Sequence, residues 1–480
     1  MKQRILVLVV CSLILGGLPG FLVCSAEGVC VEPLDAQFLN EIEEATYKGL
    51  GELLTDPRTG LPFDIFDVEM MEVLDPKTSP TNIGLLIASI VAARDREMIC
   101  EVEARERLGR IVDTLEKMEK YETPIESASP AEESANEIHR YFYNWYDLAN
   151  LDENGAPTPG APTVGAEAQR FVSFVDNSNL VVGMMVAVQA FQSTGLATRF
   201  EALVESIDFN FFYRKNPHDQ NARLMNHGFH ADTGEFSPYD YGVLNTEARL
   251  GVLISILKDD VPLDAWRTMR TIHTVYETAE GGAIIAMKSW GGDLFEHLFP
   301  DLFVNEAKYA PTSFGENNRR AVLIHIEAAK KHGLPIWGWS PSETSSGRYS
   351  AAGVPELGES GYPLNQVSPY SVLLALRYAP KEAIECLKRM IELNEQVYNK
   401  KFGFRDSIDP NTGVVCPDLL SLDKAMEAIA LHNFLMELED KEGVWSYFWS
   451  YLDSIQKDEE GKRLLEGVEF SFEDFHTELP

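Results

Sequence analysis

The stretch SPTNIGLLIASIVAARDREM, residues 79–98, carries the pattern that decides the fold class of this chain. Ser79 precedes Pro80, the order of a capping residue followed by a proline in the first turn of a helix. From Ile83 to Met98, apolar residues recur every three or four positions, which places them on one side of a helix. The stretch therefore predicts a helix with a defined start and a face that packs inward.

The same periodicity recurs along the chain from about residue 36 onward. It is found again at Phe38–Leu54, Ala104–Tyr121, Leu180–Phe191, Val243–Leu257, Ala321–Ala329, Val372–Tyr378, Ala383–Leu393, Ala425–Leu438 and Val444–Leu452. Ser313 and Glu316 read as a capping box before one of these runs. Strand patterns are short, at 171–175 and 282–287. This alternation predicts paired helices that close a ring in one all-α domain, residues 36–480.

Long connections separate the predicted helices. They span residues 55–80, 122–175, 209–240 and 340–367 and are rich in Gly, Pro, Ser and aromatic residues. Connections of this length in a compact chain are usually functional. We therefore expect the functional residues of the protein to lie in or beside these four segments.

The charge balance restricts the class of partner. Of the 480 residues, 41 are Lys or Arg and 75 are Asp or Glu, which gives a formal net charge of −34. Such a surface repels nucleic acid and anionic lipid, whereas a neutral oligo- or polysaccharide is compatible with it. The acidity serves solubility equally well. No GxSxG, HExxH or P-loop pattern is present, and the ten histidines show no ligand spacing, so neither a metal nor a cofactor is expected.

The N-terminus has the order of a secretory signal peptide. Lys2 and Arg4 precede the apolar run Ile5–Val23, which is broken by Gly and Pro and followed by the small-residue exit ending at Ala26. We expect residues 1–26 to be removed and the protein to be periplasmic or extracellular, without stable membrane insertion. Lipid anchoring at Cys24 is less favoured, because no small residue precedes it.

Six cysteines are present, and the predicted cleavage removes Cys11 and Cys24. The four that remain, Cys30, Cys100, Cys386 and Cys416, fit no zinc pattern. We expect them to be free or to form a single structural bridge.

Carboxylates beside aromatic and glycine residues carry the predicted chemistry. Glycoside cleavage needs one carboxylic acid to protonate the leaving oxygen and a second carboxylate as nucleophile or base. Glu247 and Glu343 are the catalytic candidates. The predicted substrate-binding residues are Asp176, Asn179, Tyr241, Trp290, Asp293, Glu296, Trp337, Trp339 and Tyr146. Together they predict a carboxylate-lined sugar cleft.

Each candidate also has a purely structural interpretation. Glu247 could pair with Arg249 or complement a helix dipole, and Asp176 could be a plain N-cap. Asp293 and Glu296 could be first-turn dipole partners, and Glu343 a solvated loop acid. The two tryptophans at 337 and 339 could be core residues, as could the aromatic patch at 141–147.

Several motifs in the same order resemble those of a known family. They are residues 78–85 (TSPTNIGL), 142–147 (FYNWYD), 245–250 (NTEARL), 289–300 (SWGGDLFEHLFP), 353–358 (GVPELG) and 402–406 (FGFRD), with Leu422-Asp423 after them. They resemble the glucoamylase-like (glycoamylase) domain family. That family includes the endo-β-1,2-glucanases of glycoside hydrolase family 144 and the transglycosylating domain of cyclic β-1,2-glucan synthases. The resemblance spans roughly residues 40–455 and is most recognisable over 240–455.

The resemblance implies an (α/α)6 barrel with the site at one mouth. It implies that Glu247 is the general acid or acid/base, that Glu343 is the second carboxylate, and that Asp176 and Glu296 line subsites. The loop Ser340–Tyr349 departs from one branch of the family by shifting the acid about two positions.

Three functions remain open from the sequence. The first is a hydrolase or transglycosylase acting on a β-glucan, with β-1,2 linkage expected from the resemblance. The second is a non-catalytic glycan-binding envelope protein on the same scaffold, which the shifted acid at Glu343 motivates. The third is an exo-acting α-glucan hydrolase. The products formed from a panel of glucans separate these possibilities.

Overall fold

The computed structural model describes residues 22–25, 28, 30–124, 138–160, 170–215 and 222–468. Most of the predicted signal peptide therefore lies outside the described residues. The α-helices are α1 Pro33–Lys48, α2 Pro80–Asp95, α3 Glu101–Lys117, α4 Phe174–Ala190, α5 Gly195–Ser206, α6 Ala248–Leu257, α7 Asp264–Arg267, α8 Leu294–Leu298, α9 Asp301–Val304, α10 Glu306–Tyr309, α11 Phe314–His332, α12 Pro369–Leu374, α13 Pro380–Leu393, α14 Ser421–Leu438, α15 Trp445–Ser454 and α16 Asp458–Glu466. Short π and 3-10 turns lie at Gly49–Leu53 (η1), Phe209–Phe212 (η2), Pro355–Leu357 (η3), Ala375–Arg377 (η4) and Glu395–Val397 (η5).

Short strands pair into small antiparallel sheets between the helices. They are β1 Val23–Cys24, β2 Cys30–Val31, β3 Ile65–Asp67, β4 Glu72–Asp75, β5 Lys77–Thr78, β6 Tyr121–Pro124, β7 Ile138–Tyr141, β8 Tyr146–Leu151, β9 Pro157–Pro159, β10 Phe171–Ser173, β11 Tyr213–Lys215, β12 Arg223–Asn226, β13 Gly228–His230, β14 Glu235–Phe236, β15 Asp240–Tyr241, β16 His273–Glu277, β17 Ala283–Met287, β18 Ser342–Glu343, β19 Tyr349–Ser350, β20 Tyr398–Asn399, β21 Gly403–Phe404 and β22 Asp418–Leu420. The two strand patterns seen in the sequence are confirmed as β10 and β17. The strictly all-α prediction is corrected, because backbone groups in the long connections pair with one another as short ladders.

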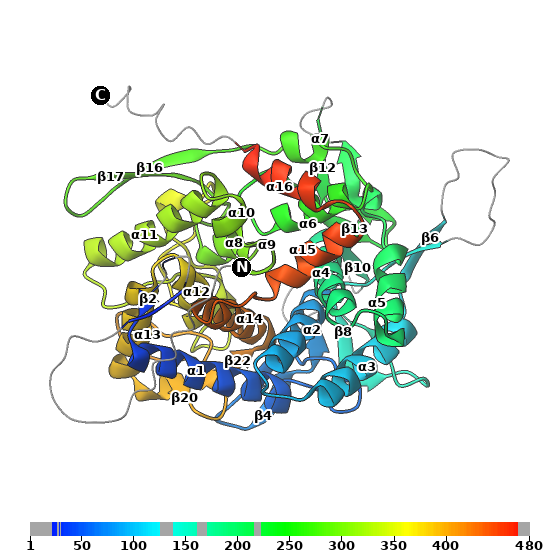
Figure 1. The fold of residues 1–480 in the computed structure, drawn as a ribbon, viewed down its shortest axis with the longest axis horizontal. Helices are drawn as coiled ribbons and strands as arrows, with labels where there is room; N and C mark the ends of the chain where they lie inside the picture. The colour runs from blue at the N-terminus through cyan, green and yellow to red at the C-terminus, as the bar shows by residue number, and fades with distance from the viewer. Residues whose placement is uncertain are drawn as a thin grey trace, which may run out of the picture.

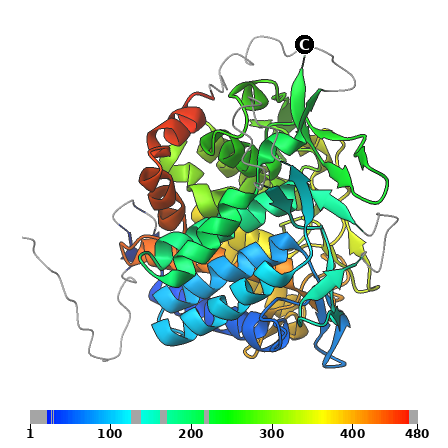
Figure 2. The same ribbon diagram turned by 90° about the vertical axis from the view of Figure 1, so that its right-hand side faces the viewer.

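The helices form two concentric rows over much of the molecule. In Figure 1, α12, α14, α2 and α4 lie inside an outer row that contains α13, α1, α3 and α5. Helix α2 packs against both α4 and α14, and α1 packs on α14. In Figure 2 the cyan and green strands gather on one side of the helices. The fold is thus helix-rich, and a closed ring of six helix pairs stays a prediction.

The inner helix pair α2 and α4 packs unusually closely. A Cβ on Gly183 would lie 2.1 Å from the carbonyl oxygen of Gly84, and a Cβ on Gly84 would lie 2.4 Å from that of Asn179. Both helices are buried around their whole circumference, so their sequences are apolar on every side. This contact fixes the first turns of the two helices relative to each other, and both turns carry polar residues of the site.

The predicted helix starts had different outcomes. Ser79 caps α2 as expected, its Oγ accepting from the amide of Asn82 at 3.1 Å. The capping box at Ser313 and Glu316 is wrong. Ser313 donates instead to the carbonyls of Ala310 and Leu465, and Glu316 pairs with two arginines one turn along α11. A tertiary contact with the C-terminal helix thus replaces the local cap.

The N-terminal segment shows an unexpected disulfide. Cys24 and Cys30 are bonded in the β1–β2 hairpin, while Cys100, Cys386 and Cys416 are free thiols. A bridge of this kind is consistent with an oxidising compartment. It persists in a mature chain only if the leader is cut before Cys24, whereas the sequence placed the cut near Ala26. Among the described residues, no helix has the length and apolarity needed to span a bilayer.

Candidate active site

The first turns of the inner helices bring the predicted acids together. Thr81, in the first turn of α2, donates to Asp176 Oδ1 at 2.7 Å and accepts from Asn179 Nδ2 at 3.2 Å. Asn82, the next residue, donates to Asp64 Oδ1 at 2.9 Å. The start of α2 therefore lies between two sets of carboxylates. We call them the Glu247 group (Asp176, Glu247, Asp293, Glu296) and the Glu343 group (Asp64, Glu343, Asp406, Asp418, Asp423).

Glu247 stands immediately before α6 and its side chain is half-buried. Burial and, to a smaller extent, the carboxylates of Glu296 and Asp176 raise its pKa to about 8, against the opposing guanidinium of Arg249. A helix N-terminus favours a carboxylate, but burial outweighs that effect here. The alternative that Glu247 pairs with Arg249 is wrong, because Arg249 forms its ion pair with Glu306. Glu247 thus holds a proton near neutral pH.

Asp293 and Glu296 lie in the glycine-opened turn at the start of α8. Asp293 caps the helix, its Oδ1 accepting from the amide of Glu296 at 2.9 Å, while its buried Oδ2 has no hydrogen-bond partner. Glu296 Oε2 accepts from the amide of Gly291 at 2.8 Å. Burial raises the pKa of Asp293 to about 8 and that of Glu296 well above its ordinary value. Asp293 is therefore the N-cap of α8 and Glu296 is the acid of its first turn, and both also border the site.

Asp176 occupies the third position of α4, and Ser173 is the N-cap. The plain N-cap interpretation of Asp176 is therefore wrong. With the Asn144 amide oriented to satisfy both its neighbours, its Nδ2 donates to Asp176 Oδ2 at 2.6 Å and its Oδ1 accepts from Trp145 Nε1 at 3.2 Å. The partly exposed ring of Trp145 is thus tied to the Glu247 group.

Glu343 lies in the second group, in β18, with a side chain that is 6% exposed. Its amide donates to Asp406 Oδ2 at 2.6 Å, and its carbonyl accepts from Ser407 Oγ. Burial raises the pKa of Glu343 to about 8, and the carboxylates of Asp406, Asp418 and Asp64 add to that effect. The solvated-loop interpretation of Glu343 is therefore wrong, because residues 406 and 407 fix its backbone inside the protein.

Asp406 and Asp423 form a buried pair within this group. Burial raises the pKa of Asp406 to about 7 and that of Asp423 well above its ordinary value, and the negative charge of Asp406 adds to the effect on Asp423. Two neighbouring buried carboxyl groups do not both ionise readily, because each carboxylate disfavours the charge of the other. Both residues belong to motifs visible in the sequence, but nothing local indicates that they meet.

Two tyrosines from the 340–367 connection lie near the acids. Tyr362 packs its ring against Gly291, where any Cβ would clash at 2.2 Å. Burial raises its pKa to about 12, with the carboxylates of Glu296, Asp293 and Glu247 adding to the effect. Its hydroxyl therefore faces the Glu247 group.

The second tyrosine, Tyr349, is 54% exposed, yet surrounding protein raises its pKa well above the ordinary value. The carboxylates of Asp423, Asp406, Asp293 and Asp64 contribute, so both groups face this hydroxyl. Sequence reasoning missed both tyrosines, because they sit in a loop without a periodic pattern.

The predicted aromatic platforms are only partly supported. Trp290 is 45% exposed, and Tyr241 is partly exposed with its ring 4.2 Å from that of His227. Trp339 and Tyr146 are fully excluded from solvent, and Trp337 is nearly so. The platform prediction is wrong for Trp339 and Tyr146, because a ring packed on both faces cannot stack on a sugar. Trp337 borders a hollow that lies away from the acids. Asn179 is buried and acts through Thr81 rather than at the surface.

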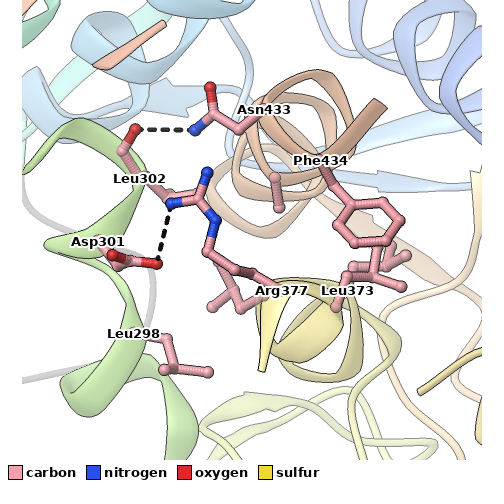
Figure 3. A pocket seen from close by; sticks show the side chains of 10 residues that line it. Leu298, Asp301, Leu302, Leu373, Arg377, Asn433 and Phe434 are labelled. Carbon is pink, nitrogen blue, oxygen red and sulfur yellow. Dashed lines mark hydrogen bonds and ion pairs between the residues drawn. The ribbon is translucent and has the colours of Figure 1, made fainter. Parts of the chain in front are cut away.

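Two cavities lie away from the acids. The smaller, of about 20 Å³, is formed by Leu298, Asp301, Leu302, Leu373, Leu374, Leu376, Arg377, Ala430, Asn433 and Phe434. Figure 3 shows Arg377 reaching Asp301 and Asn433 donating to the carbonyl of Leu302 across it. It has room for about one water molecule. The larger hollow, of about 420 Å³, lies between α11 and α13 over Trp337. Neither is lined by an acid of the two groups.

The buried acids predict a characteristic pH dependence of stability. The folded-state pKa of Asp293, about 8, is above its ordinary value of 3.8, so the folded protein binds more protons than the unfolded chain. Stability from this residue is complete below pH 4 and is lost as the pH rises to 8. The variant Asp293→Asn should therefore gain stability over the parent by at most about 1.4 kcal/mol per pH unit across this window, and level off above it. Urea unfolding at several pH values measures the difference in free energy of unfolding between the variant and the parent. A difference that does not change with pH would contradict the buried, protonated state of Asp293.

Comparison with known proteins gives one family. Residues 241–450 match the family model Glycoamylase, described as putative glucoamylase. The chain is 24% identical to the cyclic beta-(1,2)-glucan synthase NdvB of Rhizobium meliloti (strain 1021), over 77% of this chain and 16% of that protein. The chain thus spans about a sixth of the length of the curated relative that it matches.

Solved structures share the fold at low identity. A putative glucoamylase from Bacteroides caccae has a TM-score of 0.68 at 18% identity, covering 90% of this chain and 98% of its own. An endo-beta-1,2-glucanase from Chitinophaga pinensis, solved with sophorotriose and glucose, has a TM-score of 0.67 at 17% identity, covering 88% and 98%. The helix-rich fold therefore matches glucoamylase-like neighbours over most of its length. The resemblance of the sequence motifs to the glucoamylase-like domain family is thus confirmed, and the family model matches it over residues 241–450.

Proposed function

We propose that this chain is an exported glycoside hydrolase that cleaves a β-1,2-linked glucan. The observation that carries the proposal is the environment of Glu247, a half-buried carboxyl whose pKa is raised to about 8 beside three other acids. A carboxyl that keeps its proton at neutral pH is what a leaving glycosidic oxygen requires. The linkage comes from the names of the relatives, two of which act on or make β-1,2-glucan.

The roles of the two catalytic acids follow from their surroundings. Glu247 donates its proton to the glycosidic oxygen as the bond to the anomeric carbon breaks. Glu343, held by Asp406 and Ser407, serves as the second carboxylate at the sugar, and it acts in its ionised form, as nucleophile or as base for water. Asp176 and Glu296 border Glu247 and supply hydrogen bonds to sugar hydroxyls. Trp290 and Tyr241 offer ring faces to the flanking sugars.

A panel of linked glucans tests the proposal. The purified protein is incubated with β-1,2-, β-1,3-, β-1,4- and β-1,6-glucans and with starch, and the products are separated by chromatography. We expect short β-1,2-linked oligosaccharides from the first substrate alone. Glucose released from starch would instead establish the exo-acting α-glucan hydrolase.

Binding of β-1,2-glucan without any product would establish the glycan-binding protein. That second function is favoured by one observation. The carboxylates that raise the pKa of Glu247 are Glu296 and Asp176, whereas those beside Glu343 are Asp406, Asp418 and Asp64, so the two acids belong to separate groups. Binding measured by calorimetry alongside product analysis distinguishes the two outcomes.

A further inference from the structure

Arg249 lies fully buried beneath the Glu247 group, and its guanidinium uses all five of its N–H donors. Two bonds form a bidentate pair with Glu306, from Nε and from Nη2, each at 2.8 Å. The other three reach backbone carbonyls: Nη1 donates to Thr246 at 3.1 Å and to Glu296 at 2.9 Å, and Nη2 donates to His297 at 2.6 Å. One planar group thus joins two separate segments of backbone.

The two segments joined by Arg249 are those that carry the acids. Thr246 directly precedes Glu247 at the start of α6, and Glu296 lies in α8, some fifty residues along the chain. A second tie runs between the same segments, from Asn245 Nδ2 to His297 Nδ1 at 2.9 Å. The planar fork of a guanidinium fixes direction as well as distance, which an ammonium cannot do. The geometry therefore sets the position of Glu247 relative to Glu296.

We propose that Arg249 is a positioning residue, which holds Glu247 in register with Glu296 and is itself held by Glu306. This inference rests on the proposed role of Glu247 as the proton donor. A buried ion pair adds little net stability over an apolar pair of the same volume, so stability alone does not account for it. Arg249 also acts through its charge, because it opposes the burial that raises the pKa of Glu247.

Two variants test the proposal. Arg249→Lys keeps the charge but loses the fork. The double variant Arg249→Met/Glu306→Gln leaves no uncompensated buried charge, so it is the form expected to fold. We expect both to lower kcat on β-1,2-glucan by about 30- to 100-fold with KM changed less than threefold, since a displacement of about 1 Å has an effect of that size. In the double variant the alkaline limb of the kcat–pH profile should move upward, because the positive charge beside Glu247 is gone.

Arg96→Lys is the matched control. Arg96 follows the last residue of α2, at the opposite end of that helix from the site, and binds Glu43 and Glu439 in a similar partly buried network. It should lose stability without a change in kcat or in the pH profile. Folded Arg249 variants with parental kcat would overturn the proposal. An equal loss of kcat in all three variants, with an unchanged pH profile, would reduce Arg249 to a structural residue.

A readout without turnover separates this inference from the proposed function. The difference in Tm between the parent and Glu247→Gln, followed from pH 5 to pH 9, reports the pKa of Glu247 in any folded background. In the Met/Gln background the pKa of Glu247 should rise by at least half a unit. If the parent protein proves inactive, only the proposed function is overturned. The shift in the pKa of Glu247 would still decide the role of Arg249. An unmoved pKa together with unchanged kcat in an active parent would overturn the inference alone.

Discussion

Replacing Glu247 with glutamine is expected to lower kcat on β-1,2-glucan by about 10²- to 10⁴-fold, the usual contribution of a general acid. Glutamine has nearly the same shape but no acidic proton, so substrate binding should persist. The fold should also persist, because glutamine avoids the ionisation that burial and the neighbouring acids disfavour at Glu247. Kinetics at pH 6, with binding measured by calorimetry, check both parts.

Substrates with different leaving groups show whether the loss of kcat in Glu247→Gln is the loss of a proton donor. An aryl β-glucoside with an acidic phenol leaves without protonation, so Glu247→Gln should cleave it with a much smaller loss than the natural glucan. Glu101→Gln is the matched control, because Glu101, like Glu247, is an acid at the start of a helix, but it is exposed and paired with Arg105. Equal losses on the two substrates would show that Glu247 has another role.

Replacing Glu343 with glutamine is expected to lower kcat at least 10²-fold on both kinds of substrate. A nucleophile or base acts at the anomeric carbon whatever the leaving group, so an activated phenol cannot compensate for its loss. Steady-state kinetics with the glucan and with the aryl glucoside give the comparison directly. A loss of kcat that depends on the leaving group at position 247 and not at position 343 would assign the two roles from kinetics alone.

The nearby Asp406 provides the test that could refute the role of Glu343. Asp406 accepts from the amide of Glu343, and asparagine still offers an oxygen for that bond. Asp406→Asn should therefore retain more activity than Glu343→Gln if Asp406 only fixes the backbone. The reverse order, with Glu343→Gln active and Asp406→Asn inactive on both substrates, would transfer the second carboxylate to Asp406.

Much of the helical frame could be predicted because its signals are local. The start of α2 at Ser79-Pro80 and its apolar sequence depend on residues within one or two turns, and the structure confirms them. Short helices such as α8 and α9 were not predicted, since four or five residues carry too little periodicity. The small sheets were missed for a related reason, because β3 pairs with β22 across about 350 residues.

The sequence predicted the type of site, a cluster of acids with aromatic residues, but only some of the residues that form it. Acids beside aromatic residues marked Glu247 and Glu343, and both have buried, protonated surroundings. The same rule selected Trp339 and Tyr146, which are core residues, because composition around a tryptophan does not reveal which face is covered. Tyr362 and Asp64 were missed, since only the folded chain brings their loops to the first turns of the inner helices.

The sequence by itself determined a helix-rich chain with the motifs of a glucoamylase-like domain, because capping residues, apolar spacing and motif order are properties of neighbours along the chain. Tertiary structure alone decided which acids lie close enough to shift one another's pKa and which aromatic rings stay open to solvent. It also decided that Arg249 joins the segments of Glu247 and Glu296 instead of pairing with Glu247. Burial and electric field depend on groups distant in sequence, and these two quantities give a carboxyl group its chemistry.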